Sequence, residues 1–94
     1  MSLEDFHGLH PNPPKEGYIR IDWCKPTDRA VSIRVQAHTC NQELTTYELC
    51  ATGGLSHIRR TQRTSAGDRV RESPWMHTSK AQRLWNGLLD GRAR

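Results

Sequence analysis

Hydrophobic and polar side chains alternate with a period of two along much of the chain, which is typical of half-buried β-strands. The alternation covers residues 19–23 and 31–38, with a turn at 25–28 between them. In the second segment the apolar side chains all fall on one parity, at Val31, Ile33, Val35 and Ala37. We therefore predict two strands here, the second with its β-branched side chains on the buried face.

The alternating pattern continues beyond a turn at residues 39–42. Residues 43–51 form a third predicted strand, whose buried side stays open because apolar residues occur on both parities. The glycine pair at 53–54 can supply positive φ values, so we expect a tight reversal into a strand over 55–63. A second reversal at 65–68 leads into a strand over 69–73. Short turns between successive strands favour an antiparallel meander.

After Pro74 the apolar pattern changes to the 3.6-residue period of a helix. Ser79 and Gln82 have the spacing of a capping box, and Gly91 is placed to take the left-handed conformation beyond the last turn. The predicted buried stripe consists of Ala81, Leu84, Trp85, Leu88 and Leu89. The fold class that follows is α+β, with a four- or five-stranded antiparallel meander and one C-terminal helix packed on one face.

Length and composition indicate one small domain. Ninety-four residues are enough for a single compact domain, which we place at residues 17–94. Residues 1–16 contain several prolines and few periodic apolar positions, so we expect a flexible arm. Leu, Ile, Val and Phe together number 16, from 8, 4, 3 and 1 respectively, which predicts a thin core and leaves a homodimer open.

Several sequence features favour the cytoplasm. No apolar run approaches the roughly 18 to 20 residues that a membrane-spanning helix requires, so we expect no membrane contact. Acidic residues at the start stand where a secretory signal would carry basic ones. The three cysteines, Cys24, Cys40 and Cys50, are an odd number without close pairs, which favours reduced thiols over a disulfide framework.

The net charge of +4 is confined to one segment. Residues 57–71 contain five arginines and one acid, whereas the remaining chain has nine basic and nine acidic residues. The five are Arg59, Arg60, Arg63, Arg69 and Arg71. If the strands over 55–63 and 69–73 pair, we expect four guanidinium groups, all except that of Arg60, to crowd one surface of the hairpin.

An arginine-rich hairpin can bind an acidic protein surface or nucleic acid, because guanidinium bonds carboxylate and phosphate in two places. The leading hypothesis is a small, non-enzymatic regulatory or adaptor protein of the cytoplasm that uses this hairpin to contact an acidic partner. Alternatively, the hairpin has no binding function, and its charges keep it solvated and prevent its edge strand from pairing with other chains. A structural or assembly subunit that acts as an oligomer is a further alternative. Trp75 and Met76 are candidates for an interface, unless Trp75 closes the end of the core.

The chain lacks the motifs of nucleotide-binding loops, serine hydrolases and zinc proteases, so we expect no cofactor and assign no catalytic residue. A small basic ribonuclease needs only an acid, a base and a cation, and we keep it as an alternative function. Its candidate residues are His57, Glu48, Arg59 and Arg60.

Four residues could in principle ligate a metal, namely His38, Cys40, Cys50 and His57. They lack the close C-x2-C pairing that is typical of zinc sites. We therefore expect no metal.

Overall fold

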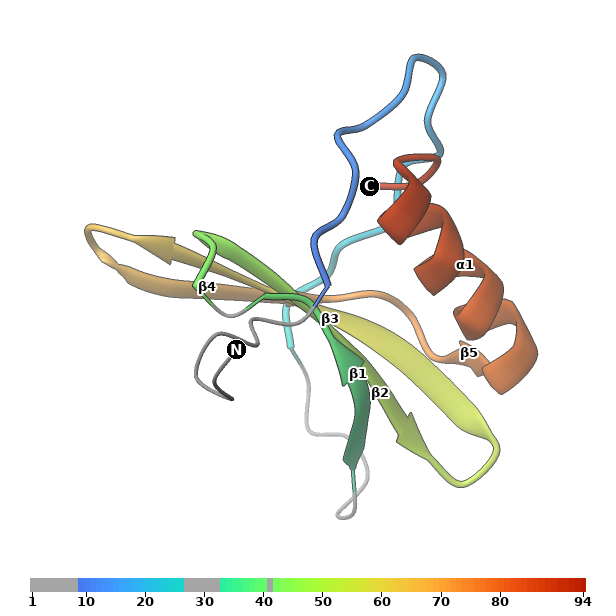
Figure 1. Cartoon of the computed structure of the whole chain (residues 1–94). Coiled ribbons are helices and arrows are strands. Elements are labelled where there is room, and N and C mark those ends of the chain that lie inside the picture. Colours follow the sequence, from blue (N-terminus) through green and yellow to red (C-terminus); the bar gives the residue numbers. More distant parts are fainter. Residues whose placement is uncertain (1–8, 27–32, 41) are drawn as a thin grey trace, which may run out of the picture.

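Five strands and one helix follow one another in the computed structural model, which describes residues 9–26, 33–40 and 42–94 (Figure 1). The elements are β1 (Arg34–His38), β2 (Thr45–Thr52), β3 (Leu55–Thr64), β4 (Gly67–Glu72), β5 (Met76–His77) and α1 (Thr78–Asp90). β1 to β4 form an antiparallel meander in chain order, and the short β5 pairs with β3. This confirms the predicted α+β class with a C-terminal helix.

Two-residue turns close both central hairpins. The turn at 53–54 joins β2 to β3, and Gly53 takes a φ of +56° there, as the glycine pair predicted. The turn at 65–66 joins β3 to β4, and Gly67 has a φ of +115°. β4 therefore begins two residues earlier than expected, and β3 and β4 form a long ribbon that projects away from α1 (Figure 1).

The core lies between α1 and one face of the central strands. Leu49 and Ile58 are direct partners across β2 and β3, and both are buried under the helix residues Trp85 and Leu88. The complete buried cluster is Ile21, Tyr47, Leu49, Ile58, Ala81, Trp85, Leu88 and Ala93. The predicted helical stripe is confirmed, with Leu84 and Leu89 at its half-buried edges.

The start of α1 differs from the prediction. The helix begins at Thr78 with His77 as N-cap, and no side chain caps it, so the capping box of Ser79 and Gln82 is wrong. Tertiary contacts fix this end instead, because Thr78 Oγ1 donates to the Gly54 carbonyl at 3.1 Å. The other end agrees with the prediction, since Gly91 has a φ of +83° and its N–H donates back into the last turn.

Residues 19–23 do not form the predicted first strand. Ile19 makes a single parallel bridge with Ala93, and Cys24 makes a single antiparallel bridge with Glu72 on β4. Ile21 is buried, but Ile19 is 66% exposed, so the alternation does not place the two isoleucines in one core. The segment instead packs along residues 92–94, and Trp23 Nε1 donates to the Arg94 carbonyl at 3.0 Å. Of the turn predicted at 25–28, residues 27 and 28 lie outside the described residues.

A β-bulge in β1 overturns the expected burial of the second segment. Val35 pairs with Cys50, whereas Ala37 pairs with Leu49, so one extra residue of β1 lies between them. A bulge rotates the following side chains to the other face. Val35 and Ala37 therefore point to opposite faces, and Val35 is 44% exposed. Val31 lies outside the described residues.

Residues 9–16 run beside the end of α1. Asn12 N–H donates to the Leu89 carbonyl at 2.8 Å, and Lys15 N–H donates to the Gly91 carbonyl at 2.7 Å. Residues 1–8 lie outside the described residues, and the flexibility of an arm over 1–16 stays a prediction. Within the described ranges, no helix has the length and apolar character to cross a bilayer.

Candidate functional site

The register of the β3–β4 hairpin gathers three arginines on one face. Residues directly opposite in an antiparallel pair point to the same side. Arg60 lies opposite Arg71, and Gln62 lies opposite Arg69. Arg60 follows Ile58 by two residues along β3, so this side continues the face that α1 covers further along the sheet. We call Arg60, Arg69 and Arg71 the arginine face.

The other two arginines of the segment lie on the opposite face and have acidic neighbours. Arg59 is paired with Glu72, and Arg63 is paired with Asp68. Arg59 Nε also donates to Glu48 Oε1 at 2.8 Å, and this hydrogen bond is the main cause that raises the pKa of Arg59. This face of the hairpin is therefore balanced in charge.

The expectation that Arg59, Arg63, Arg69 and Arg71 crowd one surface is wrong. A turn with an even number of residues pairs odd-numbered positions of one strand with even-numbered positions of the next. Arg59 and Arg63 must then lie opposite to the side chains of Arg69 and Arg71. The observed turn has two residues, 65 and 66, whereas the expected strands over 55–63 and 69–73 leave five residues between them. The register with Arg60 opposite Arg71 follows from the shorter turn.

Arg60 is half-buried, and its guanidinium contacts an aromatic ring. Its guanidinium carbon lies 4.7 Å from the centroid of the Trp23 ring, a cation–π contact. Burial lowers the pKa of Arg60, Tyr47 opposes this effect, and the positive charges of Arg69 and Arg71 lower it further. Arg69 is exposed and Arg71 half-buried, so the face offers guanidinium groups to solvent.

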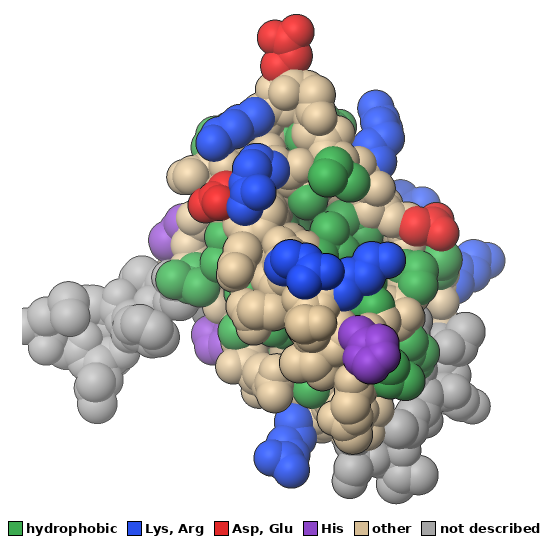
Figure 2. All heavy atoms as spheres, turned by 90° about the vertical axis from the view of Figure 1, so that its right-hand side faces the viewer, with side chains coloured by type: hydrophobic (Ala, Val, Ile, Leu, Met, Phe, Trp, Pro, Cys, Tyr) green, Lys and Arg blue, Asp and Glu red, His purple; other side chains and the backbone are tan. Residues whose placement is uncertain are grey.

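A second basic surface lies on the α1 side of the molecule. A shallow hollow of about 310 Å³ is present there, and Figure 2 shows hydrophobic side chains at this surface among lysine and arginine side chains. Its lining is Ile19, Lys80, Arg83, Leu84, Gly87, Arg92 and Ala93.

Trp75 and Met76, the predicted interface pair, follow β4. The Trp75 ring is half-buried and packs edge-on against the imidazole of His57, with 4.5 Å between ring centroids. Met76 pairs with Ser56 in the sheet and packs against the core cluster. Both side chains thus contact the domain itself, and a role in an interface or a homodimer stays a prediction.

The residues of the ribonuclease alternative are not brought to one accessible surface. His57 has 0% of its surface exposed, and its Nε2 lies 3.2 Å from Glu72 Oε2. Glu48 pairs with Arg59 on the same side of the sheet as His57, whereas Arg60 points to the other side. This geometry gives an RNA phosphate no access to the imidazole, so it does not support general acid or base catalysis by His57.

The metal candidates His38, Cys40, Cys50 and His57 do not converge. Cys50 and His57 are paired across β2 and β3, while His38 Nδ1 lies 2.9 Å from the Thr39 carbonyl oxygen. Within the described part of the chain, the three-residue group with metal-ligand atoms close together is His10, Cys40 and Glu43. Sequence reasoning found Cys40 but missed its partners. The C-x2-E spacing across the turn was a local signal for Glu43, whereas nothing local marks His10.

Comparison of the chain with protein-family models, with curated proteins and with solved structures finds no match. The chemistry of the site therefore has to follow from its own residues. The arginine face and Gln62 offer guanidinium and amide donors, which bind and orient anions.

Proposed function

We propose that the protein is a small non-enzymatic binding module of the cytoplasm, with a regulatory or adaptor role, whose β3–β4 hairpin contacts the phosphate backbone of nucleic acid. One observation carries this proposal. Arg60, Arg69 and Arg71 share a face of the hairpin on which, among the described residues, none of them has an acidic cross-strand partner, whereas Arg59 and Arg63 each have one on the other face.

Like charges placed directly opposite each other across a ladder are unfavourable in the free protein. Arg60 and Arg71 are such a pair. A bound phosphate backbone supplies the missing negative charge, and each guanidinium can bond a phosphate through two parallel N–H groups. The projecting two-stranded ribbon has a shape that fits the major groove of B-DNA (Figure 1).

The composition of the hairpin favours nucleic acid over an acidic protein surface. The cores of protein interfaces are built on apolar and aromatic anchors, whereas nucleic-acid interfaces are polar and strongly positive. Towards the tip, the pairs on the arginine face are Gln62 with Arg69 and Thr64 with Gly67. These pairs offer no apolar anchor to a protein partner.

Contacts of this kind do not depend on base sequence. Arginines that bind phosphate fix the position of a protein on nucleic acid without distinguishing bases. We therefore expect binding to duplex DNA or single-stranded RNA that is sequence-independent and sensitive to salt.

Fluorescence polarisation at low salt tests the proposal, with labelled duplex DNA, single-stranded RNA of equal length and polyglutamate as separate probes. Arg69→Gln removes a charge from the arginine face, and Arg63→Gln removes a charge from the opposite face as a matched control. We expect Arg69→Gln to weaken nucleic-acid binding about tenfold, in line with the loss of one charged hydrogen bond, and Arg63→Gln to leave it nearly unchanged.

Three outcomes would overturn the proposal. The wild type could bind neither nucleic acid, it could bind polyglutamate alone, or the two variants could lose equal affinity. The second outcome would identify an acidic protein partner instead.

A further inference from the structure

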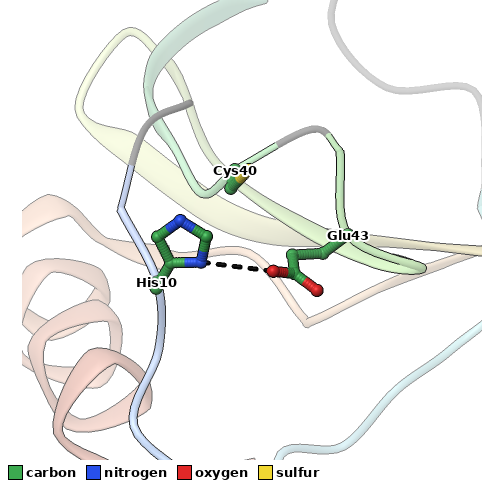
Figure 3. A group of neighbouring side chains, drawn as sticks. All are labelled: His10, Cys40 and Glu43. Atoms are coloured by element: carbon green, nitrogen blue, oxygen red, sulfur yellow. Dashed lines mark ion pairs between the residues drawn. The ribbon is translucent and has the colours of Figure 1, made fainter. Parts of the chain in front are cut away.

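Three side chains with different metal-binding atoms meet beside the turn between β1 and β2. One ligand atom from each of His10, Cys40 and Glu43 lies within 4.8 Å of the other two. His10 Nδ1 and Glu43 Oε1 are 3.3 Å apart. Figure 3 shows His10 approaching from the segment before β1, with Cys40 and Glu43 on the two sides of the turn.

Backbone contacts hold the two segments together independently of these side chains. Cys40 N–H donates to the Leu9 carbonyl at 2.7 Å, and Leu9 bridges Thr39. Thr39 is fixed in turn by Tyr47, because each donates a backbone N–H to an oxygen of the other at 2.9 Å. The residues that precede His10 and Cys40 are thus fixed by the fold, which is the positioning that a ligand set requires.

We propose that His10, Cys40 and Glu43 bind a zinc ion. A thiolate is a soft ligand that disfavours Mg²⁺ and Ca²⁺, whereas zinc accepts sulfur, imidazole nitrogen and carboxylate oxygen together. Bonds of about 2.0 to 2.3 Å to a tetrahedral zinc place its ligand atoms roughly 3.3 to 3.8 Å apart. The ligand atoms of His10 and Glu43 already have this spacing. A side-chain rotation that moves the Cys40 sulfur by about an ångström brings it to the same spacing from the other two ligand atoms.

Three protein ligands leave one position of the zinc for an exchangeable ligand. A cavity of about 440 Å³ lies beside the group, and its lining includes His10, Glu43, Tyr47 and Arg94. The cavity gives water or a small anion access to this fourth position, and Arg94 adds a positive charge to its wall. His10 and Glu43 are more than half exposed, so the ion itself can enter from solvent.

Zinc binding has a structural consequence. The ion would join the segment before β1, through coordination bonds, to the turn that leads into β2. Because Cys40 must lose its proton to bind, zinc uptake releases a proton and strengthens with rising pH. This inference does not depend on binding of nucleic acid by the hairpin.

Cobalt titration of the full chain tests the site, since Co²⁺ occupies zinc sites and reports a bound thiolate by a ligand-to-metal absorption band. We expect one equivalent of Co²⁺ to produce this band and one equivalent of Zn²⁺ to remove it. Glu43→Gln and His10→Ala alter exposed side chains, so both variants should fold, and each should weaken metal binding about 100-fold or more.

Cys40→Ser should abolish the band, and Cys24→Ser, at an exposed cysteine outside the group, serves as the matched control. Circular dichroism identifies any variant that has not folded. The proposal is overturned if the wild type gives no thiolate band, if Cys24→Ser removes it, or if the folded Glu43→Gln and His10→Ala variants bind as tightly as the wild type.

Discussion

Arg60 and Arg71 lie directly opposite each other across β3 and β4, and within the described residues neither has an acidic cross-strand partner on that face of the hairpin. The ring of Trp23 lies beneath the Arg60 guanidinium and offsets part of the repulsion by a cation–π contact. Burial and the neighbouring arginines nevertheless lower the pKa of Arg60. The free protein therefore carries an unfavourable charge arrangement on its projecting ribbon.

Arg71→Glu should stabilise the domain while it abolishes nucleic-acid binding. The substitution turns a repulsive cross-strand pair into an attractive one, which is expected to raise the free energy of unfolding by about 0.5 to 1 kcal/mol. Urea denaturation measures the stability, and fluorescence polarisation measures the binding. Arg71→Lys keeps the charge but loses the planar guanidinium, so it should leave the stability nearly unchanged and weaken binding less than Arg71→Glu does. An Arg71→Glu variant that is less stable than the wild type, or that still binds, would contradict the charge argument.

Binding to duplex DNA should weaken with salt in proportion to the number of phosphates that the arginine face contacts. Three contacts predict a slope of about −2.7 in a plot of log affinity against log salt concentration, since each contributes about −0.9. Arg69→Gln should reduce the slope to about −1.8. Arg63→Gln should leave it at the wild-type value, and a slope that changes equally in both variants would show that net charge alone governs binding.

Gly91→Ala should destabilise the domain by about 3 kcal/mol, because two costs combine at this position. Gly91 has a φ of +83°, and an added Cβ would meet the backbone carbonyl of Pro13. Left-handed backbone costs a side chain about 1 to 2 kcal/mol, and the clash with a fixed backbone adds to this. Gly54→Ala is the control, because a Cβ added there would have no atom within 4 Å and the φ of Gly54 is not positive. Thermal unfolding by circular dichroism should separate the two variants clearly.

Because α1 begins at Thr78, substitutions at two neighbouring residues should change the free energy of unfolding by different amounts. Thr78→Val removes the hydroxyl that bonds the Gly54 carbonyl and contacts the buried Ser56, so it should cost about 1 to 2 kcal/mol. Ser79→Ala should change stability by less than about 0.5 kcal/mol, because Ser79 is exposed and is not the N-cap. A loss of about 1 kcal/mol for Ser79→Ala, as an N-cap would give, would contradict this helix start.

Short-range patterns predicted most of the fold. The glycine pair at 53–54, the apolar stripe of α1 and Gly91 each depend on a few neighbouring residues, and all three agree with the structure. The prediction of a β-strand over residues 19–23 is wrong because alternation indicates an extended segment but does not identify the segment that it pairs with. Their partner is the backbone of residues 92–94 and not a neighbouring strand.

In the candidate sites, too, the features that the sequence did not predict depend on contacts between residues far apart in the chain. The separation of the arginines depends on whether the turn between β3 and β4 has an even or an odd number of residues, and the expected strand bounds gave the wrong number. The bulge in β1 and the approach of His10 to Cys40 depend on tertiary contacts, so no local pattern reports them. Charge pairing between Glu48 and Arg59 likewise requires the register of β2 against β3.

The contact between residues 12–23 and residues 89–94 determines the order in which we expect the domain to fold. Trp23 and Arg94 are separated by 71 positions, and closing a loop of that length costs roughly 4 kcal/mol of chain entropy, whereas the hairpins close over two-residue turns. We expect the hairpins and α1 to form first and this contact to form after the rate-limiting barrier. In stopped-flow kinetics, Trp23→Phe should accelerate unfolding with little effect on folding, while Leu49→Ala slows folding. If both variants slow folding equally, this order is wrong. A contact that forms after the barrier in folding is the first to open when the native protein unfolds, so residues 12–23 should separate from residues 89–94 before the sheet opens.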